Sequence, residues 1–357
     1  MYKETKFVHF YRPNKTNIVS LVIVIVYKVK KDMEALHKRT IQPDIHDHRD
    51  HQFCLHHGDK SPQYSHITCP IKLKEQMAED ILPMVDLRKS LTSEIINQGL
   101  LNSCSACAIA VAAELYLVKD NQPFINENIS NIDASQMFIY YNERVIEGKV
   151  DLNAPVFIRN GIKSLFKNGI CSEVSWPYPE TTLPKSIKNI IRTGSVAEIT
   201  AAIAKALKDN ETELHAAISQ SPSMQALTQA KKHIINRYCK LTLDNGLLDL
   251  KMSLSKGFPV IFGMMVPRSF YLTPASGIFT MPSQNEIRLG GHALLAVGYN
   301  DAAQHFIVRN SWGEEFGDKG YCYIPYDFFI GKYNTNQISQ PEETQDNTFS
   351  FWCLTHD

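Results

Sequence analysis

The sequence predicts an α+β fold built from two packed halves, because helical patterns come first along the chain and strand patterns follow. Three segments between residues 106 and 169 have the composition and periodicity of helices. Beyond Asp249, short segments rich in β-branched and aromatic residues are separated by turn signals such as Asn300-Asp301. The 357 residues leave room for one large domain with an extension, or for two domains.

The composition excludes several classes of protein. Hydrophobic residues make up 44% and charged residues 21%, which rules out a disordered, collagen-like or coiled-coil chain. Lys+Arg and Asp+Glu balance at 37 each, so no broad basic field indicates a nucleic-acid partner. No apolar run approaches the roughly 18 residues that span a bilayer, and eight cysteines are too few for a disulfide scaffold. We therefore expect a soluble globular enzyme or a large binding module.

The N-terminal region contains a continuous apolar run, Ile18–Tyr27, with Lys and Arg on both sides. Its length and basic start are compatible with an unusual or uncleaved export signal. More basic residues follow at once, however, and no small-x-small cleavage site is present. Its density of Val and Ile favours a β-strand.

Residues 46–66 carry six of the thirteen histidines, beside Cys54. Such a tract could bind a transition metal or form a contact that responds to pH. No repeated metal-ligand spacing is present, so we favour a polar, solvated connector over a metal site.

Three helices are expected before the middle of the chain. Ala106–Val118 is Ala- and Leu-rich and predicts a buried helix. Ala134–Gly148 and Arg159–Gly169 predict two more, each closing on a glycine. Thr200–Leu241 is polar, Ala-containing and helical in character. The expected strands are Phe258–Val266, Ala293–Tyr299, His305–Arg309 and Tyr321–Pro325.

Cys104 stands where the first of these helices should begin, with Asn102 and Ser103 as candidates for its cap. The unpaired amides and the dipole of a helix N-terminus favour the thiolate, which is the nucleophilic form of cysteine. This position therefore suits a nucleophile, although an isolated cysteine at a helix start more often serves packing.

Three further residues fit the same chemistry. His292 begins an apolar strand next to two glycines, where an imidazole can exchange protons across a cleft. Asn310 ends the next strand of an apparent hairpin and could orient the far ring nitrogen of His292. Gln98 precedes Cys104 by six residues, and its amide could donate to an oxyanion. Each residue alone is ordinary, so the inference depends on finding all four in this order.

These motifs resemble those of the papain-like cysteine peptidases, particularly their divergent bacterial members. The matching stretches are Gln98-Gly99, Ser103-Cys104, Gly291-His292-Ala293 and Asn310-Ser311-Trp312-Gly313. The resemblance covers about Asp86 to Phe329. It implies a two-lobed fold in which a helical left lobe carries the Cys and an antiparallel, β-barrel-like right lobe carries the His and Asn. It implies neither a metal nor a cofactor.

The surroundings of the nucleophile depart from the usual Cys-Gly-Ser/Ala-Cys-Trp/Tyr signature. Leu101 replaces the first Cys and so removes a disulfide common in secreted relatives. Asn102 replaces the Gly, and Ser105 replaces the aromatic residue, which removes a wall beside the nucleophile. Cys107 is a rival nucleophile, but it lies three residues further into the helix, whereas Cys104 has the family's spacing from Gln98.

An insertion separates the two halves. His292 follows Cys104 by 188 positions, while roughly 130–150 are usual in this family. The polar helical stretch at about 183–245 accounts for the excess. It could border or cap the cleft, bind a partner, or decorate the surface.

The resemblance implies a cysteine endopeptidase that hydrolyses protein or peptide substrates through a thioester. Cys104, His292 and Asn310 would be catalytic, Gln98 would stabilise the oxyanion, and Trp312 would shield the contact between Asn310 and His292. Residues 1–80 form an N-terminal extension, expected to be a pro-segment that inhibits the peptidase domain at 81–357. An acyltransferase or deamidase with the same residues, or a catalytically silent binding module, remains an alternative. The family suggests export or secretion, with a cytoplasmic location as the alternative.

Overall fold

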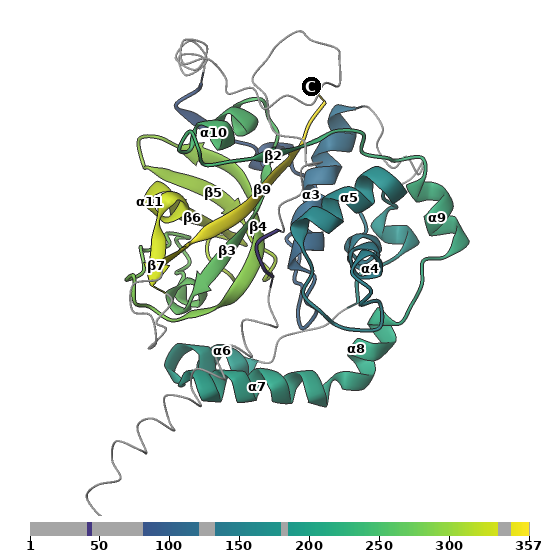
Figure 1. Ribbon diagram of the computed structural model, residues 1–357, viewed down its shortest axis with the longest axis horizontal. Helices are drawn as coiled ribbons and strands as arrows, with labels where there is room; N and C mark the ends of the chain where they lie inside the picture. The colour runs from purple at the N-terminus through teal and green to yellow at the C-terminus, as the bar shows by residue number, and fades with distance from the viewer. Residues whose placement is uncertain (1–40, 45–80, 121–132, 180–184, 335–343, 357) are drawn as a thin grey trace, which may run out of the picture.

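Figure 1 shows the fold in a computed structural model that describes residues 41–44, 81–120, 133–179, 185–334 and 344–356. The described chain forms a helical lobe and a lobe built on an antiparallel sheet, so the predicted two-lobed α+β fold is confirmed. The expected strand at Ile18–Tyr27 and the histidine tract at 46–66 lie outside the described residues. Within the described part of the chain, every helix is too short or too polar to span a bilayer.

The helical lobe is organised around α3 (Cys104–Lys119), which packs against α4 (Gln136–Ile146) and α5 (Ile158–Asn168). On its other side α3 contacts the sheet, so it lies at the boundary between the lobes. Residues from Cys104 through Leu117 are all buried. Their many alanines allow neighbouring backbones to approach closely, which is why a nearly all-round apolar helix is stable at the centre of the molecule. The three predicted helices are confirmed to within two residues at each end.

A glycine fixes the close approach of α5 to its neighbours. A Cβ atom on Gly161 would lie 2.3 Å from Glu143 Oε1 and 2.4 Å from Ile109 Cδ1. Both atoms belong to the packed interior of the lobe, so no larger residue fits without moving α3 or α4.

The sheet lobe contains a seven-stranded antiparallel sheet in the order β2-β9-β3-β4-β5-β6, with β1 paired to β4. Its strands are β1 (Met84–Asp86), β2 (Tyr238–Leu241), β3 (Val260–Pro267), β4 (Arg288–Asn300), β5 (His305–Arg309), β6 (Tyr321–Pro325) and β9 (Thr348–Leu354). Two short strands, β7 (Lys332–Asn334) and β8 (Thr344–Asp346), form a separate ladder. The helices α10 (Leu248–Ser255) and α11 (Tyr326–Ile330) and the 3-10 turns η1 (Arg88–Ser90), η2 (Glu173–Ser175) and η3 (Arg268–Leu272) complete the described elements of the two lobes. All four predicted strands are present, and β4 extends five residues further toward the N-terminus than expected.

The C-terminal strand β9 was not predicted, although it lies inside the sheet between β2 and β3. Its side chains fill the aromatic core of this lobe, where Phe351 contacts Phe262 and Phe329. The strand is therefore an interior member of the sheet, and its pairing with β2 and β3 is not visible in the local sequence pattern.

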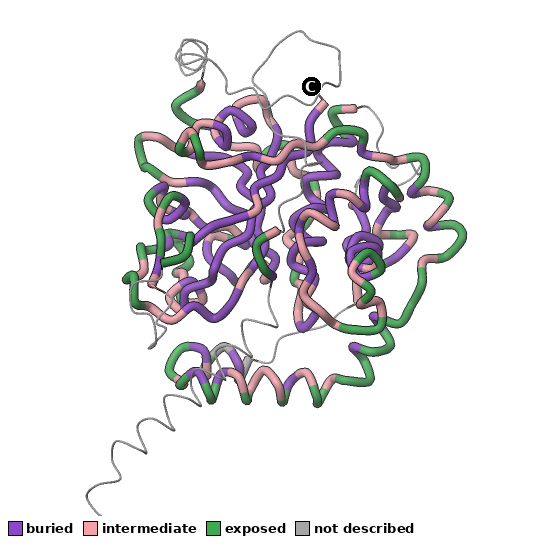
Figure 2. The backbone as a smooth tube through the Cα atoms, viewed as in Figure 1, coloured by how far each residue is buried: buried purple, intermediate pink, exposed green. Residues whose placement is uncertain are grey.

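The stretch between the lobes forms four helices, α6 (Lys185–Thr193), α7 (Val196–Asp209), α8 (Glu211–Ile218) and α9 (Met224–Ala230). The prediction of helix through Leu241 is wrong for its last residues, because Tyr238–Leu241 is strand β2 and pairs with β9. Figures 1 and 2 show α6, α7 and α8 running beneath both lobes, with buried and half-buried residues facing the body and exposed residues facing away.

Candidate active site

Cys104 is the first residue of α3, at the boundary between the two lobes. Ser103 occupies the N-cap position, but its side chain makes no capping hydrogen bond. Its hydroxyl lies 2.5 Å from the hydroxyl of Tyr178 instead. Asn102 does not cap the helix either, since its amide donates to the carbonyl of Asn153 at 2.8 Å. Ser103 is thus the predicted N-cap residue by position, but neither side chain makes the expected capping hydrogen bond. The first backbone amides of α3 therefore receive no hydrogen bond from the side chain of Ser103 or Asn102.

The sheet lobe supplies the imidazole. His292 lies on β4, and its Nε2 is 2.8 Å from Oδ1 of Asn310, which directly follows β5. An amide oxygen only accepts, so Nε2 carries the proton of this hydrogen bond and Nδ1 is left for proton exchange. The backbone amide of Ser311 also donates to Oδ1 of Asn310 at 2.8 Å, which fixes the orientation of the amide group.

Cys104 lies against the strand that carries His292, across the lobe boundary. The backbone amide of Ala293, the residue after His292, donates to Sγ of Cys104 at 3.5 Å. All three side chains of the predicted group are buried, with 8% of Cys104, 5% of His292 and 3% of Asn310 exposed. The fold thus brings together residues that lie about two hundred positions apart in the chain.

A stack of aromatic rings covers the histidine. The ring of Trp312 stacks on His292 with centroids 4.8 Å apart, and Tyr271 of η3 stacks on Trp312 at 4.5 Å. The indole therefore excludes water from one face of the imidazole beside its hydrogen bond to Asn310. Trp312 was predicted from its motif, whereas Tyr271 was not, because no local pattern marks a ring that enters the stack from another segment of the chain.

Gln98 lies close to this group and is held by hydrogen bonds. Its Nε2 donates to the carbonyl of Leu101 at 3.0 Å, and its Oε1 accepts from the hydroxyl of Ser311 at 2.7 Å. These contacts join the loop before α3 to the loop after β5, so Gln98 bridges the two lobes beside Cys104.

Burial sets the protonation of the buried pair. It raises the pKa of the Cys104 thiol to about 11. It also lowers the pKa of His292 to about 4, against the opposing effect of the hydrogen bond to Asn310. In this conformation both groups are neutral across the physiological range, because neither charge is solvated.

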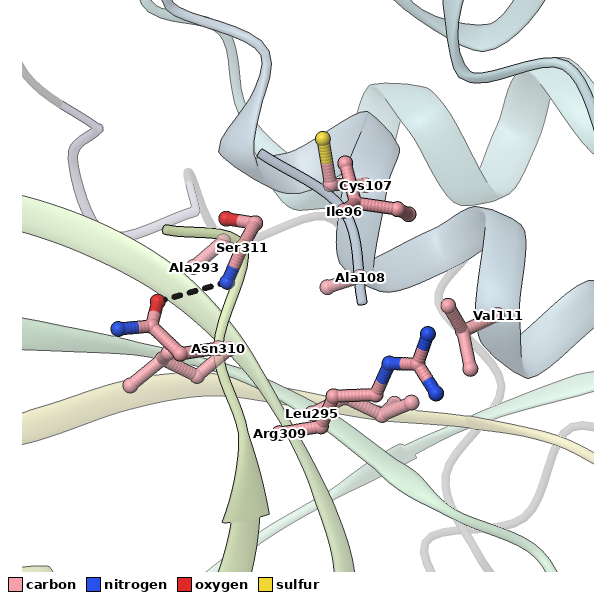
Figure 3. Close-up of a pocket in the computed structure, with 10 residues that line it drawn as sticks. Ile96, Cys107, Ala108, Val111, Ala293, Leu295, Arg309, Asn310 and Ser311 are labelled. Carbon is pink, nitrogen blue, oxygen red and sulfur yellow. Dashed lines mark hydrogen bonds between the residues drawn. The ribbon is translucent and has the colours of Figure 1, made fainter. Parts of the chain in front are cut away.

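Cys107 is enclosed more deeply than Cys104. It is 1% exposed, its Sγ lies 3.9 Å from the hydroxyl of Ser103, and burial raises the pKa of its thiol. Figure 3 shows a small cavity lined by Cys107, Ala108 and Val111 of α3 and by Ala293, Asn310 and Ser311 of the sheet lobe. The cavity has a volume of about 10 Å³, so it admits at most a water molecule and is not the substrate site.

Ser105, which stands in place of the usual aromatic residue, is fully buried. It lies beside the Glu143 carboxyl, whose pKa burial raises well above its ordinary value. The side chain at position 105 therefore packs inside the helical lobe and forms no wall of an open pocket.

Residues 41–44 lie between the lobes, where Figure 1 draws them as a short dark segment. Ile41 is 2% exposed, and its backbone packs against Gly291, the residue before His292. A Cβ atom on Gly291 would lie 1.9 Å from the Ile41 carbonyl oxygen, so only glycine admits this segment. The N-terminal region thus touches the strand that carries the histidine.

Asp44 anchors this segment to both lobes. Its carboxyl accepts hydrogen bonds from Trp352 Nε1 of β9 at 2.6 Å and from the backbone amide of Arg159 of α5 at 3.1 Å. Its own amide donates to the Ser350 hydroxyl at 2.8 Å. Burial raises the pKa of the Asp44 carboxyl, and the hydrogen bond from Trp352 opposes this shift. Asp44 was not predicted as a site residue, because its partners Ser350 and Trp352 lie more than 300 positions further along the chain and share no local motif with it.

No cluster of three His, Cys, Asp or Glu side chains that could hold a metal ion occurs among the residues that the structure describes. The histidine tract at 46–66 lies outside them, so its role stays untested.

Comparison with known proteins places this geometry in context. The family model described as "Papain family cysteine protease" matches residues 82–339. The sequence is 34% identical over 256 residues to the "Uncharacterized peptidase C1-like protein L477" of Acanthamoeba polyphaga mimivirus, covering 68% of this chain and 69% of that protein. Cathepsin S of Bos taurus matches at 36% identity over 76 residues, 20% of this chain and 22% of that protein. Xylellain, a cysteine protease from Xylella fastidiosa, superimposes with a TM-score of 0.62 at 29% identity, covering 89% of this chain and 96% of that structure.

Proposed function

The chain belongs to the papain family of cysteine proteases and is a cysteine-type peptidase. From this premise we propose that it is an endopeptidase that works through a thioester and is inhibited by its own N-terminal segment. One observation carries the assignment of residues: Cys104 accepts a hydrogen bond from the residue after His292 while His292 is hydrogen-bonded to Asn310. Protein or peptide chains would be the substrates.

In the proposed reaction, His292 takes the thiol proton on Nδ1, and the Cys104 sulfur attacks the carbonyl carbon of the scissile bond. The C–N bond then breaks, the leaving amine receives the proton from His292, and a thioester remains. Water, deprotonated by His292, hydrolyses the thioester and regenerates the thiol. Asn310 keeps the ring oriented throughout, because it holds Nε2 and leaves Nδ1 toward the reaction.

The oxyanion would form near the start of α3, where the backbone amide of Cys104 and the side-chain amide of Gln98 would donate to it. Gln98 already spans the two lobes through Leu101 and Ser311. A substrate carbonyl that displaces the contact with Leu101 would receive the Gln98 amide in its place.

The experiment that tests these roles compares Cys104→Ala with Cys107→Ala on an unfolded protein substrate. We expect Cys104→Ala to lose turnover and Cys107→Ala to retain it, with circular dichroism showing that both are folded. New amide bonds or Glu formation without chain cleavage would favour the acyltransferase or deamidase alternative. Turnover retained by purified Cys104→Ala would refute the assignment.

Inhibition by the N-terminal segment is supported by the position of residues 41–44. Ile41 packs beside the residue that precedes His292, and Asp44 ties the segment to α5 and β9. A peptide substrate must lie in the same place to reach Cys104, so the segment and the substrate would exclude one another.

The test compares the full-length chain with a protein that begins at Ile81. We expect the shorter protein to cleave a fluorogenic peptide faster, and the isolated segment added in trans to slow it again. Equal rates for the two proteins would remove the inhibitory role and leave the peptidase assignment intact.

We also propose that helices α6–α8 border the cleft as a strap between the lobes. At one end, Arg268 of η3 donates through Nε to the carbonyl of Ile191 at 2.8 Å. At the other end, Arg144 of α4 donates to the carbonyl of Ile218 at 3.1 Å. Since η3 also carries Tyr271 of the ring stack over His292, the strap joins the sheet lobe close to the catalytic residues. Flexible chains would then enter more readily than folded domains.

Export is part of the same proposal and rests on the family relationship alone. Fractionation of cells that produce the protein, with detection by antibody, tests it directly.

A further inference from the structure

Two cysteines outside the active site face each other across neighbouring strands. Cys239 of β2 lies directly opposite Cys353 of β9 in antiparallel register. The amide of Thr355 donates to the carbonyl of Arg237 at 3.3 Å, which makes that pair a hydrogen-bonded one. Hydrogen-bonded pairs recur at every second position, so Cys239 and Cys353 also form one, with Cα atoms about 5.5 Å apart. This separation lies inside the roughly 4.4–6.8 Å range that a disulfide spans.

The chemical surroundings of the pair differ from those of the other described cysteines. Cys353 is 0% exposed, whereas Cys239 is partly exposed. The hydrogen bond with Cys239 lowers the pKa of the Cys353 thiol against the opposing effect of burial, and the Ser253 hydroxyl and the charge of Lys256 also lower it. Burial instead raises the pKa of Cys171 and Cys322. One thiol of the pair is thus accessible to an oxidant, and the other is buried directly beside it.

We propose that Cys239 and Cys353 are a thiol pair that closes to a cross-strand disulfide when a small disulfide, such as glutathione disulfide, is the oxidant. The Cys239 thiolate attacks one sulfur of the oxidant, forms a mixed disulfide and releases one glutathione thiolate. The Cys353 thiolate then attacks the Cys239 sulfur, which releases the second glutathione thiolate. Two electrons and two protons leave the protein and appear on two glutathione thiols, so the exchange balances.

The position of the pair gives the bond a structural effect. Among the described strands, β2 is a four-residue edge strand whose neighbour is β9. It is the first strand after the strap, while β9 carries the Ser350 and Trp352 groups that hold Asp44. A covalent link therefore fixes the exit of the strap to the strand that anchors the 41–44 segment. Because the link closes a long loop of chain, it also removes conformational entropy from the unfolded state.

The test uses the full-length chain carrying Cys104→Ala, so that its outcome is independent of peptidase activity. The protein is incubated with glutathione disulfide or with dithiothreitol, and non-reducing digests are analysed by mass spectrometry. We expect a peptide joining Cys239 to Cys353 only in the oxidised sample, an intact mass about 2 Da lower, and a melting temperature at least about 3 °C higher.

Two variants test whether the disulfide forms between Cys239 and Cys353 specifically. Adding Cys239→Ser should abolish the linked peptide and the rise in melting temperature, whereas adding Cys322→Ala should leave the linked peptide in place even if it lowers stability. The proposal is overturned if Cys239 keeps a bound glutathione, stays open to alkylation after oxidation, or is joined to Cys54 or Cys69 instead.

Discussion

The hydrogen bonds of Asp44 lead to a direct prediction about inhibition. Asp44→Ala removes the acceptor of Trp352 Nε1 and of the Arg159 amide, and leaves a buried indole N–H without its carboxyl partner. Each such bond contributes about 1–3 kcal/mol, depending on the charge of the carboxyl. Because Asp44 is half-buried, we expect the loss of both hydrogen bonds to cost about 2–4 kcal/mol. This free energy weakens the docking of the segment on the two lobes roughly 30- to 700-fold.

The expected result is that full-length Asp44→Ala cleaves a fluorogenic peptide faster than the wild type and approaches the rate of the protein that begins at Ile81. Alkylation of Cys104 by iodoacetamide should accelerate in parallel, because opening the cleft restores solvent to the thiol. The matched control is Asp346→Ala, which removes an exposed carboxylate paired with Lys332 on the sheet lobe.

One pattern of rates would refute this reasoning. If the shorter protein is faster than the full-length chain while Asp44→Ala behaves as the wild type in both assays, the segment inhibits but Asp44 does not anchor it. If Asp346→Ala accelerates cleavage as much as Asp44→Ala, the effect comes from general loss of charge.

Three further predictions concern the site and its border. The pKa of His292 is about 4 in the folded protein and about 6.5 in the unfolded chain. The unfolded chain therefore takes up the proton first, and about 3 kcal/mol of stability is lost as the pH falls from about 6.5 to about 4. Urea titrations of Cys104→Ala should show this slope, and adding His292→Gln should remove it. Trp312→Phe makes the ring stacked on His292 smaller and admits water beside the imidazole. NMR titration should then find the pKa of His292 shifted upward from about 4. An unchanged pKa would mean that the indole does not shield the imidazole from water. Arg268→Gln removes the donor to the carbonyl of Ile191 and should loosen the strap, so that a bulky peptidyl epoxide labels Cys104 about tenfold faster while the rate of labelling by iodoacetamide changes little. The control is Lys205→Gln on the exposed face of α7. Equal acceleration of labelling by both reagents in Arg268→Gln would contradict the proposal that the strap borders the cleft.

Local sequence patterns sufficed for much of the fold and for the centre of the site. The Ala-rich helix after Cys104 and the strands around His292 and Asn310 could be predicted, since their periodicity and turn residues are encoded within about ten positions. The order of the motifs around Gln98, Cys104, His292 and Asn310 resembles that of the papain-like peptidases, and the structure places these residues around one lobe boundary.

The boundaries of the insertion were harder to predict. Polar helical composition continues toward Tyr238, but β2 forms there because β9 offers it a pairing partner. Strand pairing depends on contacts distant in sequence, and a four-residue edge strand has too little pattern of its own. The same limit explains why β9 was missed.

The sequence was enough to indicate the residues proposed for a thiol mechanism, because the short motif around each of Cys104, His292 and Asn310 is a local property. Tertiary structure alone decided that Asp44 meets Trp352, that Ile41 packs on Gly291 and that Cys239 faces Cys353. These contacts join parts of the chain separated by more than a hundred positions, and they exist only because packing of the two lobes and pairing of the strands bring those parts to the same place.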